Sequence, residues 1–323
     1  MNYIKPIIIV AGEPNSIFFE VYFKAIKFKK FKSPFILIAS FKIIKLQMKK
    51  MKINKKIRLV NIQDLTKKKL DNKFINLINV NYNQSKPFEK ISAKSNDYIK
   101  KSFNLALNIL KKEISNKFIN GPISKKYFLN KKYLGITEYL AHKSHSKNYA
   151  MLIYNEKLSV SPLTTHLPLK KVSKKITKKL IIEKVKLINI FFKKINKKKP
   201  KIAITGLNPH CESVDNFDED KKIIRPAVKY LTKLKLKVFG PYAADTIFLK
   251  KNRKKFDVIV GMYHDQVLTP IKTLFEYNAI NITLGLPFLR ISPDHGPNEK
   301  MLGKNLSNPE SLIKALTFLD KQK

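Results

Sequence analysis

Short apolar runs alternate with amphipathic stretches along this chain of 323 residues, a pattern typical of an α/β fold with mostly parallel strands. The apolar runs predict strands over residues 6–11, 34–39, 118–120, 150–154, 201–205, 237–239, 257–261 and 279–284. The amphipathic stretches predict helices over residues 16–28, 97–114, 173–195, 223–233 and 309–320. Between residues 40 and 95 the periodicity is too weak to assign elements.

The last of these helices has a well-defined start. Asn308 can cap the helix, Pro309 suits the first helical position, and Glu310 complements the helix dipole. At the other end of the chain, a short apolar run follows Lys5, and we interpret it as a buried strand rather than a signal peptide. The sequence contains no run of about 18 apolar residues, so we expect no membrane partner.

The formal net charge of +43 suggests an anionic partner, but the kind of basic residue argues otherwise. Only four of the 66 basic residues are Arg, at positions 58, 225, 253 and 290, and the lysines are spread along the chain. Nucleic-acid readers depend on the bidentate fork of Arg. We therefore interpret the lysines as a solvated surface without a specific nucleic-acid site. A basic nucleic-acid-binding protein, which would need Arg-rich or aromatic-interleaved patches, is the alternative from another class.

The single cysteine, Cys211, excludes an intrachain disulfide and favours a reducing, cytoplasmic compartment. We expect Cys211 to be a buried thiol that fills space, with its side chain pointing away from that of His210 as neighbours on a strand do. No Gly-x-Ser-x-Gly motif is present, which disfavours a serine hydrolase.

None of the nine glycines forms Gly-x-Gly-x-x-Gly or a Walker loop, so a standard Rossmann nucleotide site is disfavoured. Polar clusters instead follow the predicted strands, where open α/β sheets place their ligands. These clusters begin at Gly12, Asn120, Thr164, Gly206, Gly240, Met262 and Arg290. Their repetition predicts a site assembled from several strand ends.

Four of these clusters contain a histidine, and three of these histidines, His166, His210 and His264, each end a strand-like run beside Pro, Asp or Asn. Three neutral imidazoles from separate loops make a metal site that keeps open positions for substrate. Each histidine alone has a structural interpretation, as a hydrogen-bonding residue near a strand end. His142 and His145, three apart on a predicted helix, are expected to be solvated or to act as caps. A metal hydrolase that uses the three histidines without a nucleotide is a further alternative.

Basic and hydroxyl side chains in the clusters are candidates for holding a phosphate. Lys272 and Arg290, together with Thr137 and Asn281, could cradle a small phosphorylated substrate, with Arg acting as a fork and Lys as a point charge. The alternative for Lys272 is one more solvated lysine, and spacing alone does not separate the two.

Several of these motifs resemble the 4-hydroxythreonine-4-phosphate dehydrogenase family and occur in the family's order. Gly-Glu-Pro at 12–14 resembles its N-terminal motif, and the similarity is dense from 119 to 303 and weak between 30 and 95. The other motifs are Asn-Gly-Pro-Ile-Ser-Lys (120–125), Gly-x-Thr-Glu-Tyr-Leu-Ala (135–141), Thr-Thr-His-Leu-Pro-Leu (164–169), Gly-Leu-Asn-Pro-His (206–210), Ala-Asp-Thr-x-Phe (244–248), Met-Tyr-His-Asp-Gln (262–266) and Asn-x-Thr-Leu-Gly-Leu-Pro-x-x-Arg-x-Ser-x-Asp-His-Gly (281–296).

The resemblance implies a two-domain α/β/α subunit, similar to isocitrate and isopropylmalate dehydrogenases, with an interdomain cleft. We expect a discontinuous first domain, 1–125 plus 280–323, and a second domain, 126–279, that carries much of the metal and substrate site. The resemblance also implies a homodimer with an active site shared between subunits. It implies NAD or NADP as cofactor and one divalent metal ion, for which zinc suits the imidazoles best and Mg, Mn or Co could serve.

The resemblance also implies roles for individual residues. The family's metal ligands fall on His166, His210 and His264, and its substrate-binding residues fall on Thr137, Lys272, Asn281 and Arg290. We expect Asp245 and Asp265 to handle protons or orient a ligand. Candidate cofactor contacts are Gly12, Glu13, Pro14, Asp294 and His295.

The chain departs from the family at several positions. Ile136 stands where the family has a substrate-binding His, and Val267 replaces a family Gly. The family glycines after Asn-Pro-His are replaced by a polar stretch from Glu212 to Asp220, and Asn15 to Phe18 also differ. Pro297 and Asn298 replace small residues after Asp-His-Gly. Losing glycine restricts the backbone and could crowd the dinucleotide.

The family reaction oxidises C3 of 4-phosphooxy-L-threonine and decarboxylates the product to 3-amino-2-oxopropyl phosphate, in pyridoxal 5'-phosphate biosynthesis. The resemblance implies this reaction for the chain, with a phosphorylated amino acid as substrate. A related dehydrogenase acting on 4-phospho-threonate or 4-phospho-erythronate is the alternative that the Ile136 substitution leaves open.

Overall fold

The computed structural model describes residues 4–28, 30–67, 70–130, 132–276, 278–293 and 296–322. The chain forms two compact units, Met1–Ser144 with Pro287–Lys323 (unit 1) and His145–Leu286 (unit 2). The division into functional domains stays a prediction. Across the described ranges, no helix is both long enough and apolar enough to cross a membrane.

Unit 1 contains a wholly parallel sheet with the strand order β3-β4-β2-β1-β5-β12. These strands are β1 (Ile7–Val10), β2 (Phe35–Ala39), β3 (Ile57–Leu59), β4 (Ile75–Asn79), β5 (Lys117–Asn120) and β12 (Leu289–Ser292). Residues of β1 and β2 are buried on both faces, which is why they form uninterrupted apolar runs. In the register of this sheet, Ile7 of β1 lies opposite Phe35 of β2 and opposite Lys117 of β5.

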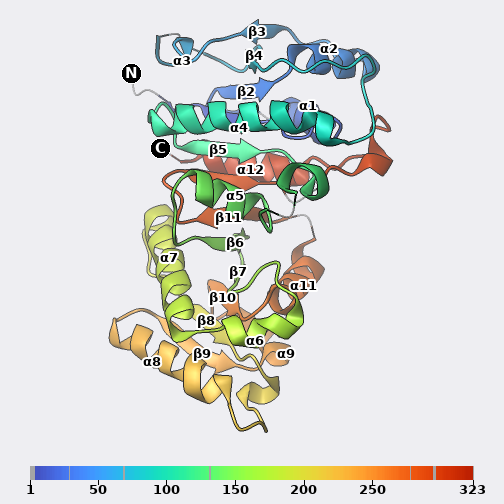
Figure 1. The fold of residues 1–323 in the computed structure, drawn as a ribbon. Helices are drawn as coiled ribbons and strands as arrows, with labels where there is room; N and C mark the ends of the chain where they lie inside the picture. Colours follow the sequence, from blue (N-terminus) through green and yellow to red (C-terminus); the bar gives the residue numbers. More distant parts are fainter. Residues whose placement is uncertain are drawn as a thin grey trace. The chain divides into compact units, whose positions relative to one another are not determined.

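Helices cover both faces of this sheet (Figure 1). Helix α4 packs on β1 and β2, and α12 packs on β1 and on α1. The unit's helices are α1 (Phe18–Phe28), α2 (Phe41–Lys50), α3 (Asp64–Lys67), α4 (Asn96–Lys111), α5 (Ile136–Lys143) and α12 (Glu310–Asp320). The predicted start of α12 is wrong by one residue: the helix begins at Glu310 with Pro309 at the N-cap, although the Glu310 amide does donate to Asn308 Oδ1 at 2.8 Å.

Unit 2 contains a mixed sheet with the strand order β11-β6-β7-β10-β8-β9. Strands β7, β10, β8 and β9 are parallel, and β6 is antiparallel to β7 and β11. The strands are β6 (Ala150–Tyr154), β7 (Ser159–Pro162), β8 (Ile202–Thr205), β9 (Val238–Tyr242), β10 (Val258–Gly261) and β11 (Ile280–Leu284). The helices are α6 (Val172–Lys175), α7 (Lys178–Asn196), α8 (Arg225–Lys233), α9 (Ala244–Ile247), α10 (Lys250–Arg253) and α11 (His264–Phe275).

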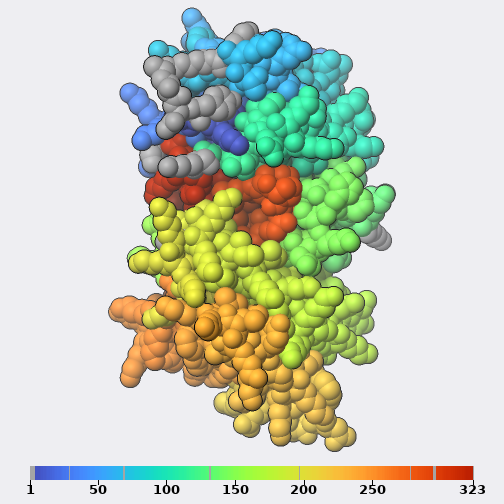
Figure 2. All heavy atoms as spheres, turned by 90° about the vertical axis from the view of Figure 1, so that its left-hand side faces the viewer, coloured from blue at the N-terminus to red at the C-terminus, as the bar shows by residue number. Residues whose placement is uncertain are grey.

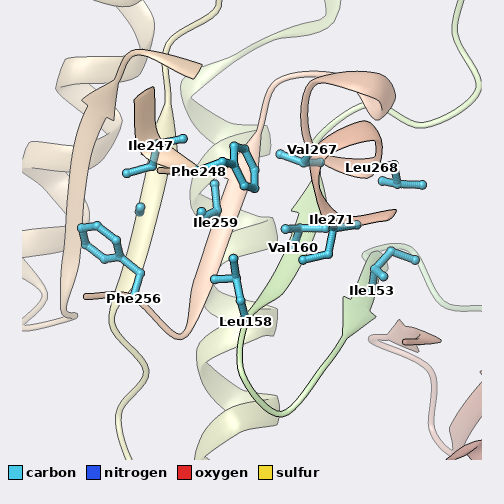
Figure 3. Close-up of a cluster of buried hydrophobic side chains, with 11 residues drawn as sticks. Ile153, Leu158, Val160, Ile247, Phe248, Phe256, Ile259, Val267, Leu268 and Ile271 are labelled. Atoms are coloured by element: carbon cyan, nitrogen blue, oxygen red, sulfur yellow. The ribbon is translucent and has the colours of Figure 1, made fainter. Parts of the chain in front are cut away.

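A buried apolar cluster fixes α11 on this sheet (Figure 3). Ile271 of α11 lies beside Val160 of β7, and Val267 and Leu268 of the same helix belong to the cluster together with Ile259 of β10. Such packing resists rearrangement because interiors are close-packed. The first residue of α11 is therefore held in place over the ends of β7 and β10.

The structure corrects the expected elements in several places, and α9, α10 and α11 are helices that were not expected. The helix expected over 173–195 is two helices, because the side chain of Thr177 accepts a hydrogen bond from the Leu180 amide and starts α7 anew. Strands β7 and β12 were not expected, and β7 is buried although half of it is serine. Segment 40–95, which gave no elements, contains α2, β3, α3 and β4.

Candidate functional site

The three candidate metal ligands follow three neighbouring parallel strands of unit 2. His166 comes after β7, His264 begins α11 directly after β10, and His210 comes after β8. In the sheet these strands lie in the order β7-β10-β8, and both pairs are parallel. Parallel strands present their carboxyl ends at one edge of a sheet, where α/β proteins place ligands. The three loops therefore start from the same edge.

Two polar clamps fix these loops on one another. Gln266 accepts hydrogen bonds at Oε1 from the Met262 amide (2.7 Å) and from Thr205 Oγ1 (2.8 Å). Its Nε2 donates to the carbonyl of Gly206 at 2.8 Å. A single side chain thus ties the end of β8 to the end of β10. Thr164 provides the second clamp, since its Oγ1 donates to the Met262 carbonyl at 2.8 Å.

The loop that carries His210 is built around the buried carboxylate of Asp220. This carboxylate accepts from the amides of Leu207 and Asn208, both at 3.0 Å, and from Asn208 Nδ2 at 3.2 Å. Gly206 must lack a side chain here, because a Cβ would lie 2.7 Å from Asp220 Oδ1. Asp220 lies in the polar stretch that replaces the family glycines, and neither it nor Gln266 was assigned a role from sequence. The only feature of the sequence that could have indicated Asp220 and Gln266 was that each is a polar residue near a motif that contains a histidine.

Two of the three imidazoles come together. The ring centroids of His166 and His264 are 6.0 Å apart, with the planes tilted by 37°. His264 Nδ1 lies 2.7 Å from Asp265 Oδ1, and because a carboxylate only accepts, this nitrogen is the donor. Nε2 of His264 is then the nitrogen that can bind a cation. Asp265 orients the His264 ring, as a hydrogen-bonded carboxylate commonly does for a metal-binding histidine. This pair fits one side of a metal site.

His210 does not complete the site in this chain. Across the residues that the structure places, no three His, Cys, Asp or Glu side chains form a group that could hold a metal ion. His210 is exposed and has a φ of 57°, a left-handed conformation uncommon outside glycine. The metal-ligand role of the three histidines stays a prediction, supported by the shared edge and by the His166–His264 pair.

Other candidate residues of unit 2 differ in their surroundings. Asp245 is exposed at the start of α9, and Asp265 is 79% exposed. Lys272 is exposed in the last turn of α11. Asn281 lies half-buried on β11, and its Oδ1 is buried without a hydrogen-bond partner among the described residues. Cys211 is buried as expected, and burial raises the pKa of its thiol.

The strand geometry assumed for residues 210–211 is wrong. Pro209–Cys211 forms a short 3-10 turn, and Cys211, like His210, has a positive φ, of 61°. The two histidines considered as a helical pair are separated as well. His142 lies in α5, 3.1 Å from the Tyr133 hydroxyl, whereas His145 follows the helix with a φ of 55°.

In unit 1, the structure brings Thr137 and Arg290 together. Arg290 is fully buried, with Nε donating to Asn120 Oδ1 at 2.8 Å and one terminal nitrogen donating to Thr137 Oγ1 at 3.0 Å. Burial lowers the pKa of Arg290 to about 10, so the group stays charged at neutral pH. Glu138, next to Thr137, acts in the opposite direction by favouring the charged form. Arg290 and Thr137 thus place a guanidinium beside a hydroxyl, two groups that bind phosphate oxygens.

Ile136 is the first residue of α5, directly before Thr137. Its half-buried side chain occupies the position where the family has a His. The sec-butyl side chain of isoleucine contributes no hydrogen bond there, and the neighbouring polar side chains of this segment are those of Thr137 and Glu138.

The candidate cofactor residues Gly12, Glu13 and Pro14 are all buried. Glu13 accepts from Ser95 Oγ at 2.8 Å and from the Asn15 amide at 3.2 Å, and burial raises the pKa of this carboxyl group. Gly12 needs to be glycine, because its φ is 77° and a Cβ would lie 2.3 Å from the Pro122 carbonyl. These contacts give the segment a structural role, and its role toward a cofactor stays a prediction. Asp294 and His295 lie outside the described residues.

Comparison with known proteins agrees with the motifs. The family model described as pyridoxal phosphate biosynthetic protein PdxA matches residues 30–319. A 4-hydroxythreonine-4-phosphate dehydrogenase from Sulfurihydrogenibium sp. (strain YO3AOP1) is 39% identical over 315 residues, 95% of each chain. A D-threonate 4-phosphate dehydrogenase from Salmonella typhimurium is 31% identical over 299 residues, 90% of this chain and 91% of that protein.

Solved structures agree as well. The crystal structure of a 4-hydroxythreonine-4-phosphate dehydrogenase from Klebsiella pneumoniae matches with a TM-score of 0.83 at 26% identity, covering 98% of both chains. Such dehydrogenases have the isocitrate/isopropylmalate dehydrogenase-like fold, which confirms the expected fold class.

Proposed function

Because this chain belongs to the PdxA family of pyridoxal phosphate biosynthetic proteins, we propose that it is a 4-hydroxythreonine-4-phosphate dehydrogenase that uses NAD or NADP. The substrate would lose hydride from C3 to the nicotinamide, and the resulting β-keto acid would lose CO2 to give 3-amino-2-oxopropyl phosphate. The observation that carries the proposal is the placement of three histidine-bearing loops after three adjacent parallel strands. That edge is where an α/β sheet places a substrate.

We propose that His166, His210 and His264 hold one divalent cation, with zinc the best match to imidazole ligands. When bound, such a cation supplies Lewis acidity toward the hydroxyl and carbonyl oxygens of the substrate. The chain's contribution is positioning: Asp265 orients the His264 ring, and Gln266 and Asp220 fix the loops. The donor set fits this role in part, because two of the imidazoles adjoin in one chain. A homodimer with a shared site, as the resemblance implies, would account for the remaining ligand.

For the phosphorylated substrate we propose Thr137, Arg290, Lys272 and Asn281 as binding residues. The Arg290–Thr137 hydrogen bond gives unit 1 a charged group beside a hydroxyl, and Asn281 gives unit 2 a buried acceptor. Ile136 removes a polar contact from this set. A D-threonate 4-phosphate dehydrogenase among the relatives makes 4-phospho-threonate the competing substrate, and 4-phospho-erythronate is of the same class.

The test is a substrate panel with the purified full chain. NADH or NADPH formation is followed by absorbance with 4-phosphooxy-L-threonine, 4-phospho-D-threonate and 4-phospho-D-erythronate, each with added zinc, magnesium or cobalt. We expect the highest kcat/KM with 4-phosphooxy-L-threonine. A higher kcat/KM with either acid would assign the chain to the related dehydrogenases, and absence of nicotinamide reduction with all three would refute the proposal.

A further inference from the structure

A pocket lies in unit 1, at the amino ends of its parallel strands. It is bordered by Phe35 at the start of β2, by Phe74 before β4 and by Lys55 before β3, together with the end of α1. Glu13 and Asn120 follow the carboxyl ends of β1 and β5, on the opposite edge of the same sheet. This pocket is therefore separate from the strand ends that carry the candidate site residues of unit 1. The edge that contains it faces the viewer in the upper, blue and cyan part of Figure 2.

The pocket combines an aromatic wall with cationic side chains. Its volume is about 440 Å³, within the range of small-molecule sites. Phe31 and Phe74, both half-buried, supply accessible aromatic surface, while Tyr22 and Phe35 are buried, and the rings of Phe31 and Phe35 are 5.1 Å apart. Three lysines, 30, 55 and 73, line it as well, and none of its described lining residues is acidic.

The wall is already organised. Asn72 accepts from the Phe35 amide at 2.8 Å and donates to the Ser33 carbonyl at 2.9 Å, which fastens the strand that enters β2. Lys55 Nζ donates to the Asn72 carbonyl at 3.0 Å, so this ammonium is held at the pocket rather than extended into water. Behind Phe74, the guanidinium of Arg58 lies 4.1 Å from the ring centroid. A pre-formed wall lowers the entropic cost of binding.

We propose that this pocket binds a small phosphorylated planar ring, with the ring against the phenylalanines and the phosphate at Lys55 and Lys73. Aromatic side chains stack on planar rings, and lysine binds phosphate as a point charge. Burial lowers the pKa of Lys55, which makes an anionic partner favourable for its charged form. Two sources supply this chemistry: phosphorylated pyridoxine compounds and nucleoside monophosphates.

The probes are chosen to separate ring from phosphate. Isothermal titration of the full chain uses pyridoxine 5'-phosphate and AMP, with glycerol 3-phosphate as the phosphate without a ring and pyridoxine as the ring without phosphate. Pyridoxine 5'-phosphate carries no aldehyde, so it cannot form imines with the many lysines of this protein. We expect one equivalent of a phosphorylated ring to bind at least about tenfold more tightly than glycerol 3-phosphate or pyridoxine.

Three substitutions locate the site. Lys55→Met should lower the affinity for the phosphorylated ring about tenfold. Lys73→Met, at an exposed position where the substitution should not disturb folding, should lower this affinity severalfold. Lys100→Met, which removes an exposed charge from α4 of the same unit, is the matched control and should leave the affinity unchanged. Circular dichroism verifies the fold of each variant.

The comparison of the two ring compounds tells the sources apart, and tight binding of either supports the proposal. It is overturned if the phosphorylated rings bind no better than glycerol 3-phosphate. It is also overturned if the Lys55 and Lys73 variants bind like the wild type, or if the Lys100 variant loses as much affinity as they do. Because no turnover is measured, the outcome is independent of the proposed dehydrogenase activity.

Discussion

Gln266 offers the sharpest test of how the candidate site is built. Its side-chain amide makes three hydrogen bonds, to the Met262 amide, to Thr205 Oγ1 and to the Gly206 carbonyl. Leucine has a similar volume and cannot make any of them. Each hydrogen bond contributes roughly 1 kcal/mol net, and partners left buried without a replacement cost more. The substitution Gln266→Leu should therefore lower the free energy of unfolding by about 3 kcal/mol.

The measurement is denaturant unfolding followed by far-UV circular dichroism, because the chain contains no tryptophan to report by fluorescence. Thr273→Ala, on the exposed side of the same helix α11, is the matched control and should stay within about 0.5 kcal/mol of the wild type. Isothermal titration with zinc gives a second readout, and the looser loops should weaken affinity roughly tenfold or more. If Gln266→Leu matches Thr273→Ala in both measurements, the clamp does not hold the ends of β8 and β10 together.

Three further predictions concern other parts of the site. Asp265→Ala should weaken zinc binding by about 10- to 100-fold in isothermal titration, since no acceptor then fixes the protonated Nδ1 of the His264 ring, and unchanged affinity would contradict that role. Ile136→His should lower KM for the phosphorylated substrate in the NADH assay by restoring a polar group beside Thr137, whereas a raised KM would mean that the pocket is shaped around isoleucine. Glu13 has a raised pKa when folded, so its contribution to stability is fully present below the unfolded value of about 4.5 and is lost as pH rises through the folded pKa. Glu13→Gln should flatten this fall in melting temperature above pH 4.5, and an unchanged pH profile would show that the carboxyl group is not its source.

The fold was largely predictable because buried parallel strands give continuous apolar runs. Strand β1, with all four residues buried, is an example. Strand β7 escaped prediction because its serines satisfy their hydroxyls locally, as Ser161 does by donating to the Met151 carbonyl. The elements of segment 40–95 were not predicted because they are short and are flanked by lysines that interrupt the apolar pattern, as at β3.

The site was predictable as a set of motifs but not as a geometry. Sequence placed His210 and His264 after predicted strands, whereas β7, the strand before His166, was not expected. Strand order, which no single motif encodes, makes the three strands neighbours. Two features of the His210 loop depend on contacts within that loop: the left-handed backbone of His210 and the buried carboxylate of Asp220. The pattern of polar residues in the sequence does not predict either of them. The burial of Arg290 was likewise unexpected, because arginine is rarely buried completely. It is buried here because Asn120 and Thr137 accept hydrogen bonds from its guanidinium, which the sequence did not reveal.

The central claim is dehydrogenation that depends on a cation held by the histidine loops. The most direct measurement follows NADH formation from 4-phosphooxy-L-threonine by the wild type and by His210→Ala, each before chelation, after chelation and after zinc is restored. We predict that wild-type turnover stops with the chelator and returns with zinc, and that the variant, folded by circular dichroism, stays inactive throughout. Wild-type turnover that persists in the chelator, or a variant as active as the wild type, would contradict the account.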